Sequence, residues 1–187
     1  MKYKFSLFFL FLTICSLAFS QTRPEREHRI KKSQFPPIEA RTVHKEAKNL
    51  KYYKEVDTSE TRYILKFRLK KLEYRLEVDE LGQTRQLGHK VGEIDVPRDT
   101  YAQMTDFVND RFPKTKIKHI LQYYSMDSDN ALKNAYQNLI LPNNTYELLF
   151  MGKKNKENKE YIATFDAEGN IIKLREALPA NFDRVLY

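Results

Sequence analysis

The sequence is poor in cysteine, glycine and proline: its 187 residues include one cysteine, five glycines and seven prolines. The cysteine, Cys15, lies in an N-terminal segment that we expect to be removed. The remaining chain then has no disulfide, no thiol nucleophile and no thiolate ligand for a metal, so its fold must depend on an apolar core. The scarcity of glycine and proline also argues against a long disordered protein.

Residues 1–20 have the pattern of a secretory signal peptide. Lys2 and Lys4 precede a nearly continuous apolar run, and small residues stand just before the expected cleavage site after Ser20. The run is too short for a stable membrane span. We therefore expect a periplasmic or secreted protein.

Two alternatives remain for this N-terminus. A lipoprotein signal would end at Cys15, but it needs a small residue before the cysteine, where this chain has Ile14. Apolar sequence also continues past Cys15. The second alternative is a retained anchor.

The expected mature chain is modestly basic. Without residues 1–20, 31 of the 33 basic residues remain against 25 acidic ones, a net charge of +6. The two signs are mixed along the chain, so nucleic acid is not an expected partner. Residues 21–35 lack apolar periodicity and predict a flexible basic arm, through which the protein can contact a membrane surface. An envelope-associated protein that binds anionic polymer or lipid is therefore one functional hypothesis.

Apolar and polar residues alternate in two neighbouring segments, residues 62–70 and 72–79, which predicts half-buried antiparallel strands joined at Lys70–Lys71. A polar hairpin loop is expected in GKKNKENKE, residues 152–160. Further strands are expected in NLKYYKEVD, QTRQL, KIKHILQYY, TYELLFMG, EYIATFD and NIIKL.

Helices are expected in three places. The clearest covers residues 97–112, where Met104, Val108 and Phe112 recur at helical spacing. A shorter helix is expected to begin at Pro37 and to continue to residue 47, because proline suits a first helical turn. The third is an insertion near residues 128–143.

Two segments, EYRLEVDELGQ and EYIATFDAEGN, share Glu, Tyr, Asp and Gly at the same spacing. We interpret each as a tight turn, in which Asp79 or Asp166 accepts backbone N–H groups and the glycine takes a positive φ. A calcium loop would need several oxygen ligands at alternate positions, and Leu81 interrupts the first copy. We therefore expect no metal and no cofactor.

The order of elements repeats along the chain. We expect an α+β fold of two tandem units, each with a helix packed on one face of a four-stranded antiparallel sheet. The units comprise residues 36–95 and 96–178, and residues 179–187 form a C-terminal tail. The pattern leaves open whether the two sheets are continuous.

The repeated motifs resemble those of a known family. Y-x-L-x-F, seen in YILKF and YELLF, is followed each time by E-Y-x4-D-x2-G, and the whole lies behind a signal peptide. This pattern is similar to PepSY-like proteins, which are related to the β-lactamase-inhibitor-like fold, and the similarity covers residues 36–178. The resemblance implies an exported, non-catalytic binding or inhibitory module with an open sheet face and an unknown protein partner. It supplies no fixed active-site residues.

Strand alternation predicts which side chains such a partner would meet. We expect the strand aromatics to face the helices: Tyr63, Phe67, Tyr74, Tyr146, Phe150, Tyr161 and Phe165. The opposite face would be charged in the first unit and apolar in the second, and exposed apolar strips are typical of partner surfaces. The insertion or the C-terminal tail is the alternative occupant of this face. The predicted contact residues are Arg62, Lys66, Arg68 and Arg75 in the first unit, and Ile120, Tyr124, Leu149, Met151 and Ile162 in the second.

Catalysis is not expected. The histidines lack metal-ligand spacing, no serine lies in a nucleophile elbow, and no glycine-rich phosphate loop occurs. His119 is expected on the inner row of its strand, as a core histidine. The remaining alternative is a small acid–base enzyme with Asp106, Asp110 and His119 between helix and sheet, which would require a deep pocket and a raised carboxyl pKa.

Overall fold

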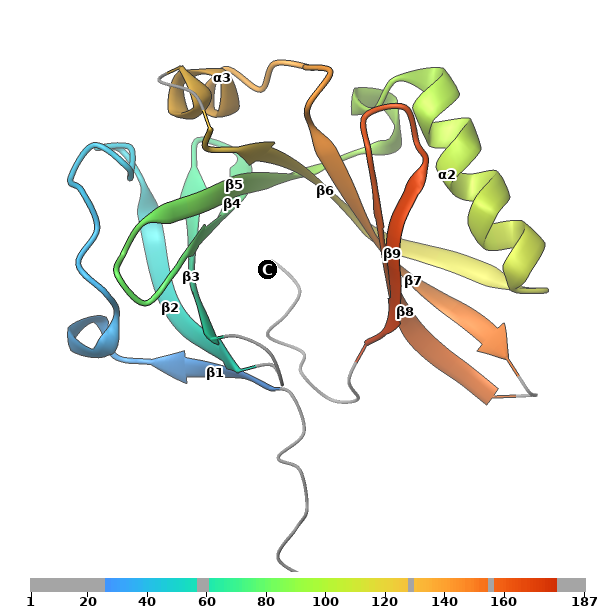
Figure 1. Cartoon of the computed structure of the whole chain (residues 1–187), viewed down its shortest axis with the longest axis horizontal. Coiled ribbons are helices and arrows are strands. Elements are labelled where there is room, and N and C mark those ends of the chain that lie inside the picture. Colours follow the sequence, from blue (N-terminus) through green and yellow to red (C-terminus); the bar gives the residue numbers. More distant parts are fainter. Residues whose placement is uncertain (1–25, 57–60, 128–129, 155–156, 178–187) are drawn as a thin grey trace, which may run out of the picture.

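The computed structural model describes residues 26–56, 61–127, 130–154 and 157–177. The described chain forms one nine-stranded sheet whose strands follow sequence order, each antiparallel to its neighbours (Figure 1). The predicted signal peptide, residues 21–25 and the predicted tail lie outside the described ranges. The strands are β1 (Arg26–Ile30), β2 (Lys48–Val56), β3 (Thr61–Leu69), β4 (Leu72–Val78), β5 (Thr84–Val91), β6 (Thr115–Ser125), β7 (Thr145–Lys154), β8 (Glu157–Phe165) and β9 (Ile171–Glu176).

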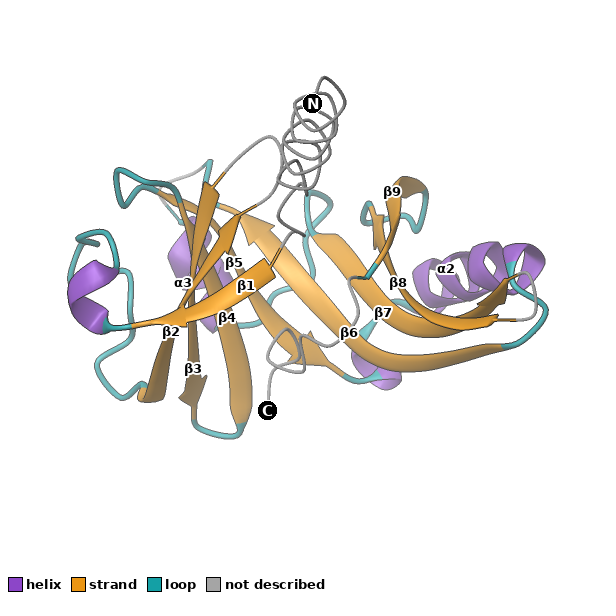
Figure 2. Ribbon diagram, turned by 90° about the horizontal axis from the view of Figure 1, so that it is seen from below, coloured by secondary structure: helices purple, strands orange, loops and turns teal. Residues whose placement is uncertain are grey.

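Among the described residues, two α-helices, α2 (Arg98–Arg111) and α3 (Ala131–Tyr136), accompany the sheet, together with the short 3-10 helices η1 (Lys32–Gln34) and η2 (Glu93–Asp95). The α+β class is therefore confirmed. The sheet bends into an arch, and both α-helices lie on its outer, convex side (Figure 1). Figure 2 shows β6 in the middle of the sheet, between β1–β5 and β7–β9. Within the described ranges, neither α-helix is long and apolar enough to cross a membrane.

Helix α2 covers β6–β9 and forms the first core. It begins after Pro97, and its buried Met104 and Val108 pack, together with Phe112, on the aromatic row of β7 and β8. This is the predicted helix with the predicted apolar face. The sheet contributes Ile120, Tyr146, Leu148, Phe150, Tyr161, Ala163 and Phe165 to this core.

The second core lies on the same side of the sheet, over β3–β5. Here α3 and the irregular segment of residues 35–47 replace a long helix, with Ala135 and Leu132 packed on the strands. Helix α3 is the predicted insertion, although it spans only part of residues 128–143. The strand residues of this core include Leu65, Phe67, Tyr74, Leu76, Val78, Leu87 and Tyr124. All the aromatics that were predicted to face the helices belong to these two cores or pack against them.

The helix expected from Pro37 does not form; residues 35–47 contain only turns and irregular backbone. The segment has few apolar residues, so it lacks a continuous apolar face that packing could hold as a helix on the strands. The apolar side chains Phe35, Ile38 and Val43 pack against the second core without helical spacing.

The predicted arm is also partly wrong, because residues 26–30 form β1, which pairs with β2 from Arg26↔Val56 to Ile30↔Tyr52. This pairing satisfies backbone groups that the edge of β2 would otherwise expose. The predicted polar loop of residues 152–160 is mostly strand as well, since β7 and β8 continue their pairing to Lys154↔Glu157.

The two Asp-x-x-Gly turns have the predicted structure. In the first, Asp79 Oδ1 accepts the backbone N–H groups of Leu81 and Gln83, each at 2.9 Å, and Gly82 has φ +79°. In the second, Asp166 Oδ1 accepts the N–H groups of Glu168 and Asn170 at 3.1 and 2.8 Å, and Gly169 has φ +94°. Both aspartates therefore shape hairpin turns.

Candidate binding face

The sheet face opposite α2 and α3 is concave (Figure 1) and is called the concave face below. Within the described ranges, both α-helices pack on the other face. Strand alternation and register place four of the predicted contact residues, Arg62, Lys66, Arg68 and Arg75, on the concave face. The face includes Tyr53 and Glu55 of β2, Arg62, Ile64, Lys66 and Arg68 of β3, Arg75 and Glu77 of β4, His119, Leu121 and Tyr123 of β6, Glu147, Leu149 and Met151 of β7, and Glu160 and Ile162 of β8.

A buried charge network occupies the first half of this face. The Arg75 guanidinium donates from Nη2 to Glu55 Oε2 at 3.3 Å and from Nε to Glu77 Oε1 at 3.0 Å. All three side chains are less than 10% exposed. Gln86 Nε2 donates to the second oxygen of Glu77 at 2.8 Å. Because buried charges need such partners, this network holds the Arg75 fork in a fixed orientation.

Tyr123 joins the charged first half of the face to the second half. It lies beside Gly88 of β5, where an added Cβ would stand 2.5 Å from the Tyr123 ring. The glycine thus lets the ring lie across β5 toward β4. The Tyr123 hydroxyl is buried and has no hydrogen-bond partner among the described residues. Burial raises its pKa well above the ordinary value, although Arg75 acts in the opposite direction.

The second half of the concave face contains a group of apolar residues. Leu121, Tyr123 and Ile162 are buried, while Leu149 and Met151 are half-buried. Leu149 lies opposite Ile162 in the β7–β8 pair. The register also places His119, Glu160 and Arg175 on this half, opposite Leu149, Met151 and Ile162. Most of the apolar side chains are shielded from solvent, so the expected exposed apolar strip is not seen.

Ile120 and Tyr124 are the two predicted contact residues that the structure places elsewhere. Ile120 packs in the core under α2, and Tyr124 packs in the core under α3. The cause is an irregularity in β6, where the register with β7 shifts between Ile117 and His119. One extra residue at a bulge reverses the alternation that follows it. Leu121 and Tyr123 therefore take the concave positions that were predicted for Ile120 and Tyr124.

Glu147 is an acidic group of this half of the face, where Glu160 also lies, opposite Met151. Burial raises the pKa of its carboxyl, and the neighbouring charge of Glu77 acts in the same direction, while Arg75 opposes both. The carboxyl therefore takes up a proton more readily than an exposed glutamate does.

The residues of the acid–base alternative do not come together. Asp106 and Asp110 are exposed on α2, on the convex side. The same bulge places His119 on the concave side, opposite Leu149, so its predicted core position is wrong. The sheet separates the histidine from both carboxylates. Among the described residues, no group of histidine, cysteine or acidic side chains could hold a metal ion.

No protein-family model matches the sequence, and no curated protein matches it. Among solved structures, the chain is similar to a presumed periplasmic protein of Bacteroides eggerthii, with a TM-score of 0.47 and 9% identity over 74% of this chain and 84% of the other. A BLIP-like protein of Bacteroides fragilis gives a TM-score of 0.46 and 8% identity over 80% and 94% of the two chains. A DUF2874 family protein of Bacteroides ovatus gives a TM-score of 0.45 and 9% identity over 70% of this chain and 77% of the other. The structural neighbours thus include the BLIP-like, β-lactamase-inhibitor-like group that the sequence motifs resemble, at scores that carry no conclusion about activity or partner.

Proposed function

We propose that this protein is an exported, non-catalytic binding or inhibitory module that holds a protein partner against its concave face. The observation that carries the proposal is the joining of an oriented charge network and a group of apolar residues on one sheet face, with both described α-helices on the other. Export rests on the signal-peptide pattern of residues 1–20.

The chemistry of the face favours a protein as the partner. Leu149 and Met151, which are half-buried, offer apolar contact area to a partner. Arg68, whose side chain is half exposed, offers charge beside the buried Arg75 network, and such charge supplies specificity more than affinity. A small ligand would need an enclosed pocket, whereas this surface extends over several strands.

The test is a crosslinked pull-down from the envelope fraction of the source cells, with residues 21–187 as bait. The wild-type bait is compared with the double variant Leu149→Asp/Met151→Asp. We expect capture of one protein to fall at least about tenfold in the double variant, because each new carboxylate would be desolvated without a partner. The control is Ile94→Asp, since Ile94 is 95% exposed and lies outside the concave face.

Circular dichroism and thermal melting of each bait show whether it is folded. Equal capture by wild type and a folded double variant would remove the concave face as the binding surface. Binding of both baits only to anionic polymer or lipid, lost at moderate salt, would instead favour the envelope-polymer hypothesis. A loss with Ile94→Asp equal to that with the double variant would also contradict the assignment.

A further inference from the structure

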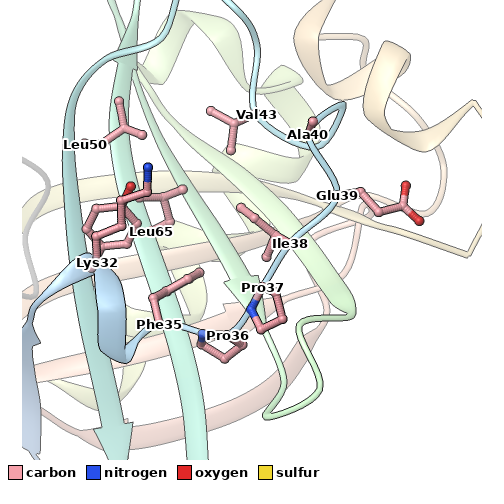
Figure 3. A pocket seen from close by; sticks show the side chains of 11 residues that line it. Lys32, Phe35, Pro36, Pro37, Ile38, Glu39, Ala40, Val43, Leu50 and Leu65 are labelled. Atoms are coloured by element: carbon pink, nitrogen blue, oxygen red, sulfur yellow. The ribbon is translucent and has the colours of Figure 1, made fainter.

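A pocket of about 360 Å³ lies away from the concave face, between strands β2 and β3 and residues 35–43 of the irregular segment. Phe35, Ile38, Val43 and Leu50 surround it, and Leu65 of the second core also lines it (Figure 3). Its volume falls within the range of small-molecule sites, which are mostly apolar with a few polar groups at the edge.

The pocket exists because the first half of the chain lacks a long helix. In the second half, α2 fills the equivalent place above the strands with Met104, Val108 and Phe112. In the first half, residues 35–47 cross the strands without helical packing and leave a space. Leu50, which borders this space, is 40% exposed.

The irregular segment is nevertheless fixed at both ends. Near its start, Gly82 of the β4–β5 turn lies so close to Pro37 that an added Cβ would stand 1.9 Å from the Pro37 carbonyl oxygen. Near its end, the Tyr136 hydroxyl donates to the Thr42 carbonyl at 2.7 Å and accepts the His44 N–H at 3.2 Å. The walls are therefore held in place before any ligand arrives, which reduces the entropic cost of binding.

The charges at the edge of the pocket favour an anion. Lys32 lies at this edge, with its side chain extending beside Leu50 (Figure 3). Lys32 forms no ion pair within the part of the chain that the structure describes. Glu39 is the acidic residue of the lining, and its Oε2 lies 2.5 Å from Arg41 Nε in an ion pair. Because its charge is paired, Glu39 repels an incoming anion only weakly.

We infer that this pocket binds a small amphipathic carboxylate of the medium-chain fatty acid class. The acyl chain lies among Phe35, Ile38 and Val43, and the carboxylate pairs with the Lys32 ammonium. Burial of the methylenes supplies most of the affinity, and the ion pair selects the head group. This site is separate from the proposed partner surface.

The test uses decanoate as the probe and ¹⁵N-labelled residues 21–187 as the protein. We expect saturable amide shifts in residues 32–52 and at Leu65, with the concave face unaffected. Lys32→Gln should weaken binding about two- to fivefold, as expected for one partly exposed ion pair. The matched control Lys45→Gln, which changes an exposed lysine of the same segment outside the pocket lining, should bind as wild type does.

Three results would overturn the inference. The first is the absence of saturable shifts, and the second is shifts centred on Leu149 and Ile162 in place of the pocket. The third is equal affinity of Lys32→Gln and Lys45→Gln, combined with equal affinity of wild type for decanoate and for the neutral analogue decanol. Because the pull-down with the Leu149→Asp/Met151→Asp bait does not involve this pocket, either proposal can fail without the other.

Discussion

His89 is a buried histidine on the helix-facing side of β5. Its ring stacks on Tyr124 at a centroid distance of 5.9 Å and lies 5.5 Å from Tyr74, and the residue is 3% exposed. Burial lowers its pKa from 6.5 to about 4, although the charge of Asp95 partly opposes the shift. The folded protein therefore keeps His89 neutral at pH values where an unfolded chain protonates it.

The lowered pKa of His89 predicts that the folded protein loses stability as the pH falls. The contribution of neutral His89 to stability is complete above pH 6.5 and is lost as the pH falls from 6.5 toward 4, because only the unfolded state gains the proton there. The loss is about 3 kcal/mol at most. Urea denaturation at several pH values should show a shallower decline for His89→Phe than for wild type, while the exposed His28→Gln follows wild type. An unchanged pH profile in His89→Phe would contradict the prediction.

At the residue scale, the sequence alone identifies most of the concave face. Period-two alternation correctly separates Arg62, Lys66 and Arg75 from the core aromatics, because those strands keep their register with their neighbours. Ile120 and Tyr124 were assigned to the wrong face because one bulge reverses the alternation within β6. A bulge of this kind depends on the neighbouring strand, so no local pattern of residues predicts it.

At the element scale, one of the two expected long helices forms, as α2, and the one expected after Pro37 does not. The segment of α2 has a complete apolar face with Met104 and Val108 at its centre, and this face packs on the strands of the first core. The segment after Pro37 has few apolar residues, and tertiary contacts of Phe35 and Val43 determine its path. Weak helical patterns of this length are stable only when packing supports them.

Helix α2 should therefore carry much of the stability of the second half. Met104 is fully buried between the helix and the strands, so Met104→Ala would remove core contacts and leave a cavity. We expect a loss of about 2–5 kcal/mol in the free energy of unfolding, measured by urea denaturation. Asp106→Ala, on the exposed side of the same helix, should change it by less than about 0.5 kcal/mol. Similar losses in both variants would mean that α2 is not held by this core.

At the scale of the whole molecule, the repeated motifs predict two units but not how they join. The described residues form a single sheet, because β5 pairs with β6 from Gln86↔Ser125 to Val91↔Ile120. The residue pattern of each repeat does not specify which strand of the other repeat it pairs with, so the continuity of the sheet could not be predicted. The junction also shares core residues, since Tyr124 of β6 packs in the core of the first half.

This junction predicts that the protein unfolds as one cooperative unit. A fragment of residues 21–95 would lose Tyr124 and α3 from its core and would expose the edge of β5, so we expect it to remain unfolded. For residues 21–187, calorimetry should give one transition with equal calorimetric and van't Hoff enthalpies. Two resolved transitions, or a folded fragment of residues 21–95 by circular dichroism, would show that the halves are independent domains. In that case the concave face would depend on how the two domains are positioned, and Tyr123 would no longer be held against β4 and β5 by a continuous sheet.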